Sequence, residues 1–266
     1  MDYRKLNAVT TRDVYPLPLI ESALTRLRGS TVFTSLDLES GFWQMPLREV
    51  DWPKSAFITP DGLWQFKVMP FGLASASASF QRMIDLVLAG LKWTSCLTYI
   101  DDVIVYARDH EEHRQRLREV FLCLQNANLK LKLKKCHFAE PHLKVLGHIV
   151  SEDGIRPDPE LLKAVSDFPY PDPKLKDNKK LERIQSFVGT CNFYRRFIEN
   201  FATMARPLTN LNRKDQPFKF GEEERKSFDA LKAVLCAAAT LAHPDPGMEI
   251  ELNADASSYG LGAVLA

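Results

Sequence analysis

Three aspartates have the type and spacing that chemistry would require. Asp37 follows the apolar, β-branched run at 31–36, which predicts that it stands at the end of a strand. Asp101 and Asp102 lie between two runs rich in Val, Ile and Tyr, which predicts a tight hairpin with these two residues as its turn. A sheet that contains both elements would bring the three carboxylates to one place.

Carboxylates held among apolar strands repel one another and lose hydration, so they need a cation. Magnesium suits such a site because it takes oxygen ligands and keeps positions open for phosphates. Two such ions can activate an attacking hydroxyl and stabilise a leaving oxygen, which is the chemistry of polymerases. Spacing alone fits a solvated turn at 101–102 and a helix-capping Asp37 equally well.

The segments around these aspartates predict an antiparallel sheet with helices on one face, which is class α+β. The helices are expected at 75–89 and from Asp109 onward, where apolar residues recur every three or four positions. The expected β segments are a strand at 31–38, a hairpin at 54–69, a hairpin at 97–106, and strands at 129–133 and 145–150.

Beyond Pro157 the pattern changes to helices. Asp158-Pro159 supplies a cap and a first-turn proline, and 169–180 is expected to be a linker. A helix from Leu181 either continues through 194–197 or breaks at Gly189, and a further helix is expected at 222–235. Strand-like runs follow at 250–255 and 260–265.

Composition is that of a globular chain. Its 266 residues are 45% hydrophobic and 26% charged, which suits about two domains and excludes a disordered tail or a collagen-like fibre. The net charge of +1 gives no overall attraction to nucleic acid or membrane, so such binding must come from local patches. Because no apolar run is long enough to span a bilayer and the first residues do not resemble a signal peptide, we expect a soluble, intracellular chain.

The five cysteines suggest reduced thiols, because they are odd in number, far apart and never in a Cys-x-x-Cys pair. Cys136, His137, His142 and His148 fall close together along the chain, but their spacings match no zinc pattern. We therefore expect neither a disulfide framework nor a zinc site.

Several motifs carry a family resemblance. The Tyr-Ile-Asp-Asp sequence at 99–102 resembles the Tyr-x-Asp-Asp motif of reverse transcriptases, and 36–42 is similar to the family's first catalytic motif. Between them, 54–59 and 69–81 resemble the nucleotide-site motifs. Segments 133–138, 145–151 and 187–198 are similar to gypsy-type long-terminal-repeat retrotransposons. The motifs follow in the family's order and span nearly the whole chain.

This resemblance implies a right-hand polymerase fold. Residues 1–155 would form partial fingers and a ferredoxin-like palm with an antiparallel sheet, and residues 156–215 a helical thumb. Residues 216–266 would form a connection region and the truncated N-terminal part of an RNase H-like domain. The implied activity is RNA-directed DNA polymerisation with two Mg²⁺ ions, or Mn²⁺, on an RNA or DNA template with a primer and deoxynucleoside triphosphates. The implied setting is a larger polyprotein in the cytoplasm, within the virus-like particle of a retroelement.

The resemblance also assigns a metal site. Asp37, Asp101 and Asp102 would be the metal-binding catalytic triad, with the backbone carbonyl of Leu38 as a further ligand. Asp255 resembles the first catalytic aspartate of an RNase H domain, whose other carboxylates lie beyond this sequence, so we expect no RNase H activity from this part alone.

The nucleotide site follows in the same way. Phe42 would be a steric gate against a 2′-hydroxyl, although it could instead be a core residue. Met69, Pro70, Phe71 and Gly72 would form the wall beside the incoming nucleotide, although they could also be an ordinary turn. Phe71 stands where retroviral relatives usually carry Gln, which fits the retrotransposon branch and leaves the retroviral hydrogen bond unsupported.

Two groups would contact primer and template. Leu146, Gly147 and His148 would lie on the hairpin that grips the primer end, although His148 could be a plain surface histidine. Tyr194, Arg195 and Arg196 would lie on the thumb and follow a duplex minor groove. Lys130, Lys132 and Lys134 could face phosphates or form a solvated strand face.

The sequence departs from the family's pattern at its N-terminal side. Residues 2–7 resemble the middle of the fingers, so the upstream fingers strands with the residues that hold the triphosphate are expected to be missing from this fragment. A catalytically silent fragment that retains only nucleic-acid binding is therefore the alternative to an active polymerase.

Overall fold

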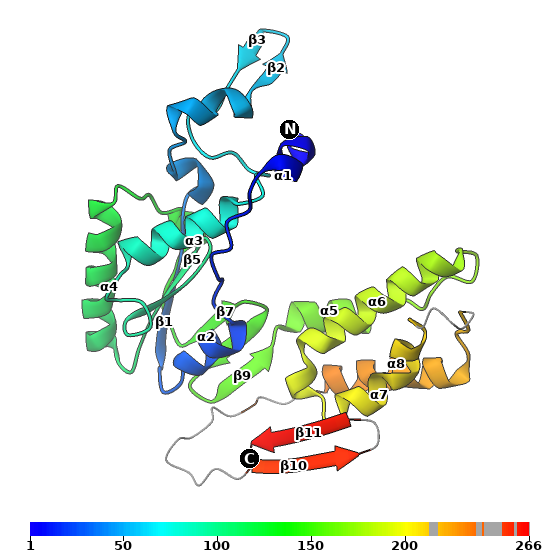
Figure 1. Ribbon diagram of the computed structural model, residues 1–266. Helices are drawn as coiled ribbons and strands as arrows, with labels where there is room; N and C mark the ends of the chain where they lie inside the picture. Colours follow the sequence, from blue (N-terminus) through cyan, green and yellow to red (C-terminus); the bar gives the residue numbers. More distant parts are fainter. Residues whose placement is uncertain (213–217, 238–240, 242–251, 258–259, 266) are drawn as a thin grey trace.

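A four-stranded antiparallel sheet forms the centre of the molecule. The computed structural model describes residues 1–212, 218–237, 241, 252–257 and 260–265. The strands are β4 (Cys96–Tyr99), β5 (Asp102–Ala107), β1 (Val32–Asp37) and β6 (His137–Glu140), in that order across the sheet. Figure 1 shows this sheet between two groups of helices. The predicted α+β class with an antiparallel palm sheet is confirmed.

Helices α3 (Ala76–Val87) and α4 (His110–Asn126) cover one face of the sheet. Because side chains alternate along a strand, every second residue of β1 and β5 faces these helices. The buried residues that pack there include Leu36, Val103, Val105, Phe80, Ile84, Val120 and Leu124. The Asp109 carboxylate accepts a hydrogen bond from the Glu112 N–H at 2.8 Å, so α4 begins at its predicted cap.

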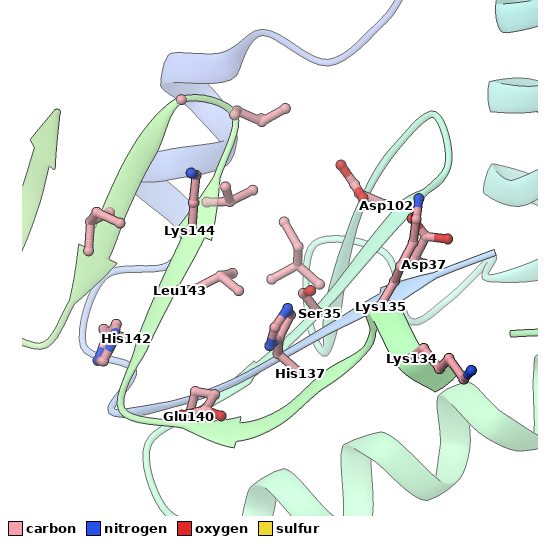
Figure 2. A pocket seen from close by; sticks show the side chains of 15 residues that line it. Ser35, Asp37, Asp102, Lys134, Lys135, His137, Glu140, His142, Leu143 and Lys144 are labelled. Carbon is pink, nitrogen blue, oxygen red and sulfur yellow. The ribbon is translucent and has the colours of Figure 1, made fainter. Parts of the chain in front are cut away.

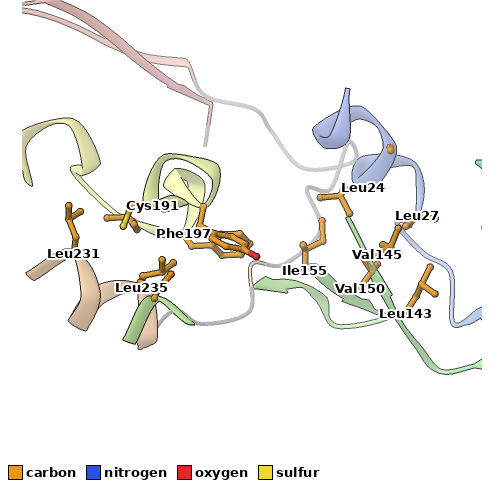
Figure 3. Packing of buried hydrophobic residues seen from close by; sticks show 14 of the residues in the cluster. Leu24, Leu27, Leu143, Val145, Val150, Ile155, Cys191, Phe197, Leu231 and Leu235 are labelled. Carbon is orange, nitrogen blue, oxygen red and sulfur yellow. The ribbon is translucent and has the colours of Figure 1, made fainter. Parts of the chain in front are cut away.

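The opposite face packs on a second, smaller sheet only at one end. This sheet is the antiparallel meander β7 (His142–Val145), β8 (His148–Ser151) and β9 (Gly154–Pro157), and α2 (Ile20–Arg26) lies beside it. Figure 3 shows Leu24 of α2 and Leu27, which caps its end, facing this sheet, with helical residues beyond it. The cluster includes Phe33, Ile104, Leu143, Val145, Val150 and Ile155. The end of the palm sheet that carries the aspartates is not covered by this cluster.

The fingers side is built from short elements. Helix α1 (Arg4–Val9) precedes the 3₁₀ helices η1 (Gly41–Gln44) and η2 (Glu49–Ser55), and the hairpin β2 (Phe57–Thr59) and β3 (Gly62–Trp64) follows at the predicted place. The Tyr3 hydroxyl donates to the Ser55 carbonyl at 3.2 Å, which ties α1 to η2.

The C-terminal part is helical, as predicted. It consists of α5 (Pro159–Ser166), α6 (Asp177–Phe193), the 3₁₀ helix η4 (Arg195–Phe197), α7 (Phe201–Asn210) and α8 (Glu222–Cys236). Helix α6 begins within the predicted linker and runs through Gly189 without a break. Helix α7 was not predicted, because Pro207 interrupts its sequence pattern. Strands β10 (Leu252–Ser257) and β11 (Gly260–Leu265) form a hairpin, and no described helix could span a membrane.

Two strand predictions are wrong. Residues 129–133 make only an isolated bridge, Leu38 to Leu131, before the 3₁₀ helix η3 (Leu133–Lys135), because the edge of β1 pairs with β6 instead, at Phe33 and Ser35. Residues 145–150 are not one strand, because Leu146 and Gly147 adopt φ of 47° and 76° and close a tight turn between β7 and β8. The hairpin expected from the resemblance is therefore confirmed at the position where periodicity predicted a continuous strand.

Candidate active site

The hairpin that carries Asp101 and Asp102 turns one residue earlier than predicted. Tyr99 pairs with Asp102, so the two-residue turn is Ile100-Asp101 and Asp102 is the first residue of β5. Ile100 has φ of 53°, a left-handed conformation that is strained for a β-branched side chain. The strand register was thus misplaced, and the correction moves Asp102 onto the sheet itself.

This register places two carboxylates side by side. Asp37 is the direct partner of Asp102 on neighbouring antiparallel strands, so both side chains leave the same face of the sheet. Figure 2 shows both at the end of a cleft of about 850 Å³. The Leu38 N–H donates to the Asp101 carbonyl at 3.4 Å, which places Leu38 against the turn. The structure therefore brings the predicted triad and Leu38 to one end of the sheet.

The surroundings of Asp101 and Asp102 disfavour their ionised forms. Burial raises the pKa of Asp102, and the Asp37 carboxylate raises it further. Burial also raises the pKa of Asp101, with added contributions from Asp102 and Asp37. The Lys135 ammonium lies 3.0 Å from the Asp37 Oδ2 and lowers both pKa values. Lys135 is a site residue that the sequence analysis missed, because a lysine after the run at 130–134 carries no distinguishing signal.

One carboxylate oxygen is left without a partner. Asp101 Oδ1 is buried and receives no hydrogen bond. It lies against η1, where a Cβ on Gly41 would be 2.6 Å away, so only glycine fits at that position. An unpaired, buried carboxylate oxygen is costly unless a cation or a donor satisfies it.

These observations fit a divalent cation. The donors are hard oxygens, burial and then charge repulsion raise the pKa values of Asp101 and Asp102, and one oxygen lacks a partner. Within the described ranges, no three Asp, Glu, His or Cys side chains are grouped so that they could hold a metal ion as they stand, so the three aspartates share one end of the sheet without forming a finished set of ligands.

Gln81 holds the turn from behind. Its Oε1 accepts a hydrogen bond from the Ile100 N–H at 2.7 Å, and its side chain is fully buried in α3. The sequence analysis missed it, although a signal was available: Gln81 lies on the same helix stripe as Phe80 and Ile84, and a polar residue on an apolar stripe needs a partner.

The predicted nucleotide-site residues lie next to one another. The Phe42 ring of η1 lies 5.4 Å from Phe71 and 5.6 Å from Phe80, between an exposed ring and a buried one. Met69 is buried, and its N–H donates to the Met45 carbonyl at 2.9 Å. Phe42 therefore touches both the core and the surface, and its role as a gate stays a prediction.

The loop that follows Met69 is held by α1. Pro70 is buried and Gly72 adopts φ of 93°, which favours glycine. The Asn7 side chain donates to the Gly72 carbonyl at 2.8 Å and accepts from the Ala74 N–H at 2.8 Å. The exposed Phe71 is thereby presented from a fixed loop.

The β7–β8 turn is enclosed by aromatic rings. His148 is buried rather than a surface histidine, and its Nδ1 lies 2.8 Å from the Leu146 carbonyl oxygen. Burial lowers the pKa of His148. The rings of Phe193 and Tyr194 lie 5.4 Å from His148, and the Tyr194 hydroxyl donates to the Gly147 carbonyl at 2.6 Å.

The predicted thumb cluster is divided by the fold. Tyr194 is 1% exposed, so its ring supports the β7–β8 turn and does not face a duplex in this structure. Arg195 and Arg196 are exposed and remain available to phosphates.

The predicted lysine face is divided too. Lys134 lines the cleft, Lys130 lines a separate hollow beside α4, and Lys132 is exposed. Asp255 lies on β10 opposite Gly262, and its side chain falls outside the described part of the chain.

Comparison with known proteins places the chain in a family. Residues 1–150 match the family described as reverse transcriptase (RNA-dependent DNA polymerase), and residues 220–266 match an RNase H-like domain found in reverse transcriptase. The chain is 40% identical to the Drosophila melanogaster Pol polyprotein of transposon opus and 37% identical to that of transposon gypsy, over its whole length in both cases. It spans about a quarter of those relatives, 27% and 26% of their lengths.

Solved structures share the fold. A foamy viral protease-reverse transcriptase in complex with double-stranded DNA has a TM-score of 0.84 at 23% identity, with 96% of this chain and 44% of that chain covered. The same viral protein in complex with an RNA/DNA hybrid has a TM-score of 0.80, also at 23% identity, with 96% of this chain and 34% of that chain covered. The chain belongs to the reverse transcriptase family, and it resembles the Pol polyproteins of gypsy-type long-terminal-repeat retrotransposons.

Proposed function

We propose that this chain catalyses template-directed DNA synthesis as the reverse transcriptase domain of a retrotransposon Pol polyprotein. The observation that carries the proposal is the direct pairing of Asp37 with Asp102 on adjacent strands, with Asp101 in the adjoining turn. In this reaction the primer 3′-hydroxyl oxygen bonds to the α-phosphorus of a deoxynucleoside triphosphate. The bond from that phosphorus to the bridging oxygen breaks, pyrophosphate leaves with the electron pair, and the hydroxyl proton passes to water.

The three aspartates and the Leu38 carbonyl would hold two Mg²⁺ ions, or Mn²⁺. When bound, such ions make the primer hydroxyl more acidic and neutralise charge on the phosphates. The chain itself contributes position and charge. Lys135, which forms an ion pair with Asp37, would offset part of the negative charge of the carboxylates when no metal ion is bound.

The nucleotide would lie over the aromatic surface of η1. The contact between Phe42 and the exposed Phe71, whose rings are tilted by 51°, offers an apolar surface beside the carboxylates. The loop from Met69 to Gly72 would align the sugar and base, since it is fixed through Asn7 and Met45. Phe42 would exclude ribonucleotides by volume.

Template and primer would lie along the cleft. Its walls carry Lys134, Lys135 and Lys144, although Lys144 is engaged by Asp158 at 2.9 Å. Leu146 and Gly147 line the same cleft at the β7–β8 turn and would support the primer end. The complexes of the foamy viral protein support a duplex ligand here, either DNA or an RNA/DNA hybrid. The proposed cellular setting is a virus-like particle in the cytoplasm.

Primer extension tests this function. The chain is incubated with a homopolymer RNA template, a complementary DNA primer, the matching deoxynucleotide and Mg²⁺, and Asp102→Asn is the matched control. Extension by the chain and none by the control would support the proposal. Duplex binding without extension, in Mg²⁺ and in Mn²⁺, would favour a catalytically silent fragment.

A further inference from the structure

A largely buried carboxylate that the proposed chemistry does not use lies behind the Ile100-Asp101 turn. Asp85 of α3 forms an ion pair with Lys92 at 2.5 Å, and their side chains are 11% and 16% exposed. Its Oδ2 also accepts from the Tyr15 hydroxyl at 2.8 Å. Its Oδ1 accepts from the Thr98 hydroxyl at 2.8 Å and from the Gln81 Nε2 at 2.9 Å. Four donors from different parts of the chain thus meet at one carboxylate.

This arrangement fixes which way the Gln81 amide points. An ionised carboxylate can only accept hydrogen bonds, so the Gln81 nitrogen must face Asp85. The same nitrogen donates to the Thr98 oxygen at 3.1 Å. The Gln81 oxygen is therefore directed toward the Ile100 N–H, to which it lies at 2.7 Å. The opposite amide orientation would set two donors against each other at Ile100 and two acceptors against each other at Asp85.

The hydrogen bond to Ile100 is positioned where the hairpin cannot supply one. In a two-residue hairpin turn, the N–H of the first turn residue has no partner within the hairpin. Ile100 is also left-handed and β-branched, so its conformation must be imposed by its surroundings. The next two residues are Asp101 and Asp102. Any shift of Ile100 therefore moves both carboxylates.

We propose that Asp85 is a positioning residue that orients Gln81 and so holds the Ile100-Asp101 turn in the geometry that binds the metal ions. Lys92 keeps Asp85 ionised, and Tyr15 ties the N-terminal segment into the same network. Thr98 of β4 closes the network with two bonds. The catalytic consequence rests on the proposed polymerase function, whereas the positioning itself does not.

A purely structural ion pair is the competing explanation. Buried ion pairs often add little stability over apolar residues, whereas loss of one partner leaves a costly unpaired charge. Loss of Asp85 would then lower stability in general, and function would fall only as stability falls. The two explanations predict different behaviour of the Ile100 amide, because only the positioning role predicts a specific loss of its protection when Asp85 is replaced.

Variants of the full chain separate the two. Asp85→Asn removes the obligatory acceptor, and Ile84→Val is the matched control, since it is the adjacent buried residue and faces the core instead of the network. The double variant Gln81→Glu/Asp85→Asn reverses the direction of the hydrogen bond between positions 81 and 85. The carboxylate at 81 still accepts from the Ile100 N–H, and the amide at 85 donates to that carboxylate. Gln81→Met removes the same hydrogen bond without a change at Asp85, and it serves if Asp85→Asn does not fold.

Three measurements are compared between variants whose melting temperatures fall by similar amounts. Amide hydrogen exchange reports on Ile100 against the remaining amides of β5, Mn²⁺ titration reports on the carboxylates, and primer extension gives kcat and KM for the nucleotide. We expect Asp85→Asn and Gln81→Met to speed Ile100 exchange, weaken Mn²⁺ binding and lower kcat about tenfold to a hundredfold, with a smaller change in KM. The double variant should recover most of each.

The outcomes decide between the explanations. Ile100 exchange no faster in Asp85→Asn, or in Gln81→Met, than in Ile84→Val would overturn the proposal, as would a double variant no better than Asp85→Asn. Faster Ile100 exchange and weaker Mn²⁺ binding in a chain whose wild type extends no primer would support the positioning role and contradict the polymerase function instead.

Discussion

Two tight turns, at 100–101 and at 146–147, are built alike; the second lines the cleft, and the first adjoins it through Asp102. Each has a left-handed first residue, and each is held by one side chain from a distant helix or helix end. Gln81 accepts from the N–H of Ile100, and Tyr194 donates to the carbonyl of Gly147. The backbone design is shared, so the difference between the turns lies in what surrounds them.

The surroundings differ in how well their polar groups are satisfied. The turn at 146–147 is enclosed by rings, and the one histidine beside it has its Nδ1 at hydrogen-bond distance from a carbonyl. The turn at 100–101 carries a buried oxygen without a partner and two carboxylates whose pKa values are raised. One turn has its polar groups satisfied in the folded chain, whereas the unpaired oxygen of the other would be satisfied by the cations of the proposed function. Local incompleteness of this kind is typical of a functional site.

Replacement of the unsatisfied carboxylates should have the largest effect. Asp101→Asn or Asp102→Asn removes a proposed metal ligand, and we expect primer extension to fall by at least about a thousandfold. Loss of charge repulsion should leave the melting temperature of the metal-free chain unchanged or slightly higher. Activity assays and thermal melts measure both. Primer extension at the wild-type rate in either variant would contradict the proposal that the unsatisfied carboxylates at 101–102 make this turn functional.

The aromatic contact beside the catalytic turn should have the next largest effect. If the Phe42 ring lies under the deoxyribose, Phe42→Val opens space for a 2′-hydroxyl, and about a hundredfold of sugar discrimination should be lost. Competing incorporation of matched ribo- and deoxyribonucleotides measures this. If Phe42 is a core residue like Phe80, the same variant should cost about 1–3 kcal/mol of unfolding free energy and leave selectivity unchanged.

The two turns also show how far the sequence could lead. Several helices and their caps followed from periodicity and from residues such as Asp109 and Asp158, because these signals are local. The turn positions did not, since apolar residues on both sides of 101–102 fit either register. The register is set by the pairing of Asp37 with Asp102, which is a contact between distant segments. The resemblance located the hairpin at 146–147 that periodicity alone treated as one strand.

The supporting residues were the least predictable. Tyr194 was grouped with Arg195 and Arg196 because they are adjacent, yet the helix end buries the ring and exposes both guanidinium groups. Gln81 and Asp85 carry no motif of their own, and only the packing of α3 against β4 shows what they hold.

The complete turn should respond to mutation through stability alone. Tyr194→Phe removes the hydroxyl that donates to the Gly147 carbonyl, which keeps its second hydrogen bond from the Asp158 N–H at 3.1 Å. We expect a loss of about 0.5–1.5 kcal/mol in unfolding free energy, measured by denaturant titration. Mn²⁺ affinity at the aspartates should not change. A weaker Mn²⁺ site in this variant would show that the two turns are coupled.

The smallest expected effect concerns how the unfolding free energy depends on pH, because Asp102 and His148 contribute to it with opposite signs. For Asp102 the folded pKa lies above its ordinary value of 3.8, so the unfolded chain loses its proton first as pH rises, and the unfolding free energy falls until the pH passes the raised pKa. For His148 the folded pKa lies below its ordinary value of 6.5, so the unfolded chain gains its proton first as pH falls. Its stabilising contribution is therefore lost from about pH 6.5 downward.

Difference curves between wild type and single variants remove the contributions of titrating groups that do not interact with the replaced residue, such as the buried His113. Without divalent cations, Asp102→Asn should gain stability relative to wild type as pH rises above about 4, and saturating Mg²⁺ should abolish or reverse this gain because it binds the ionised site. His148→Gln should lose less stability than wild type as pH falls below about 6.5, with or without Mg²⁺. A Mg²⁺-dependent His148 curve, or an Asp102 curve that ignores Mg²⁺, would mean that the cation is bound elsewhere than at the 100–101 turn.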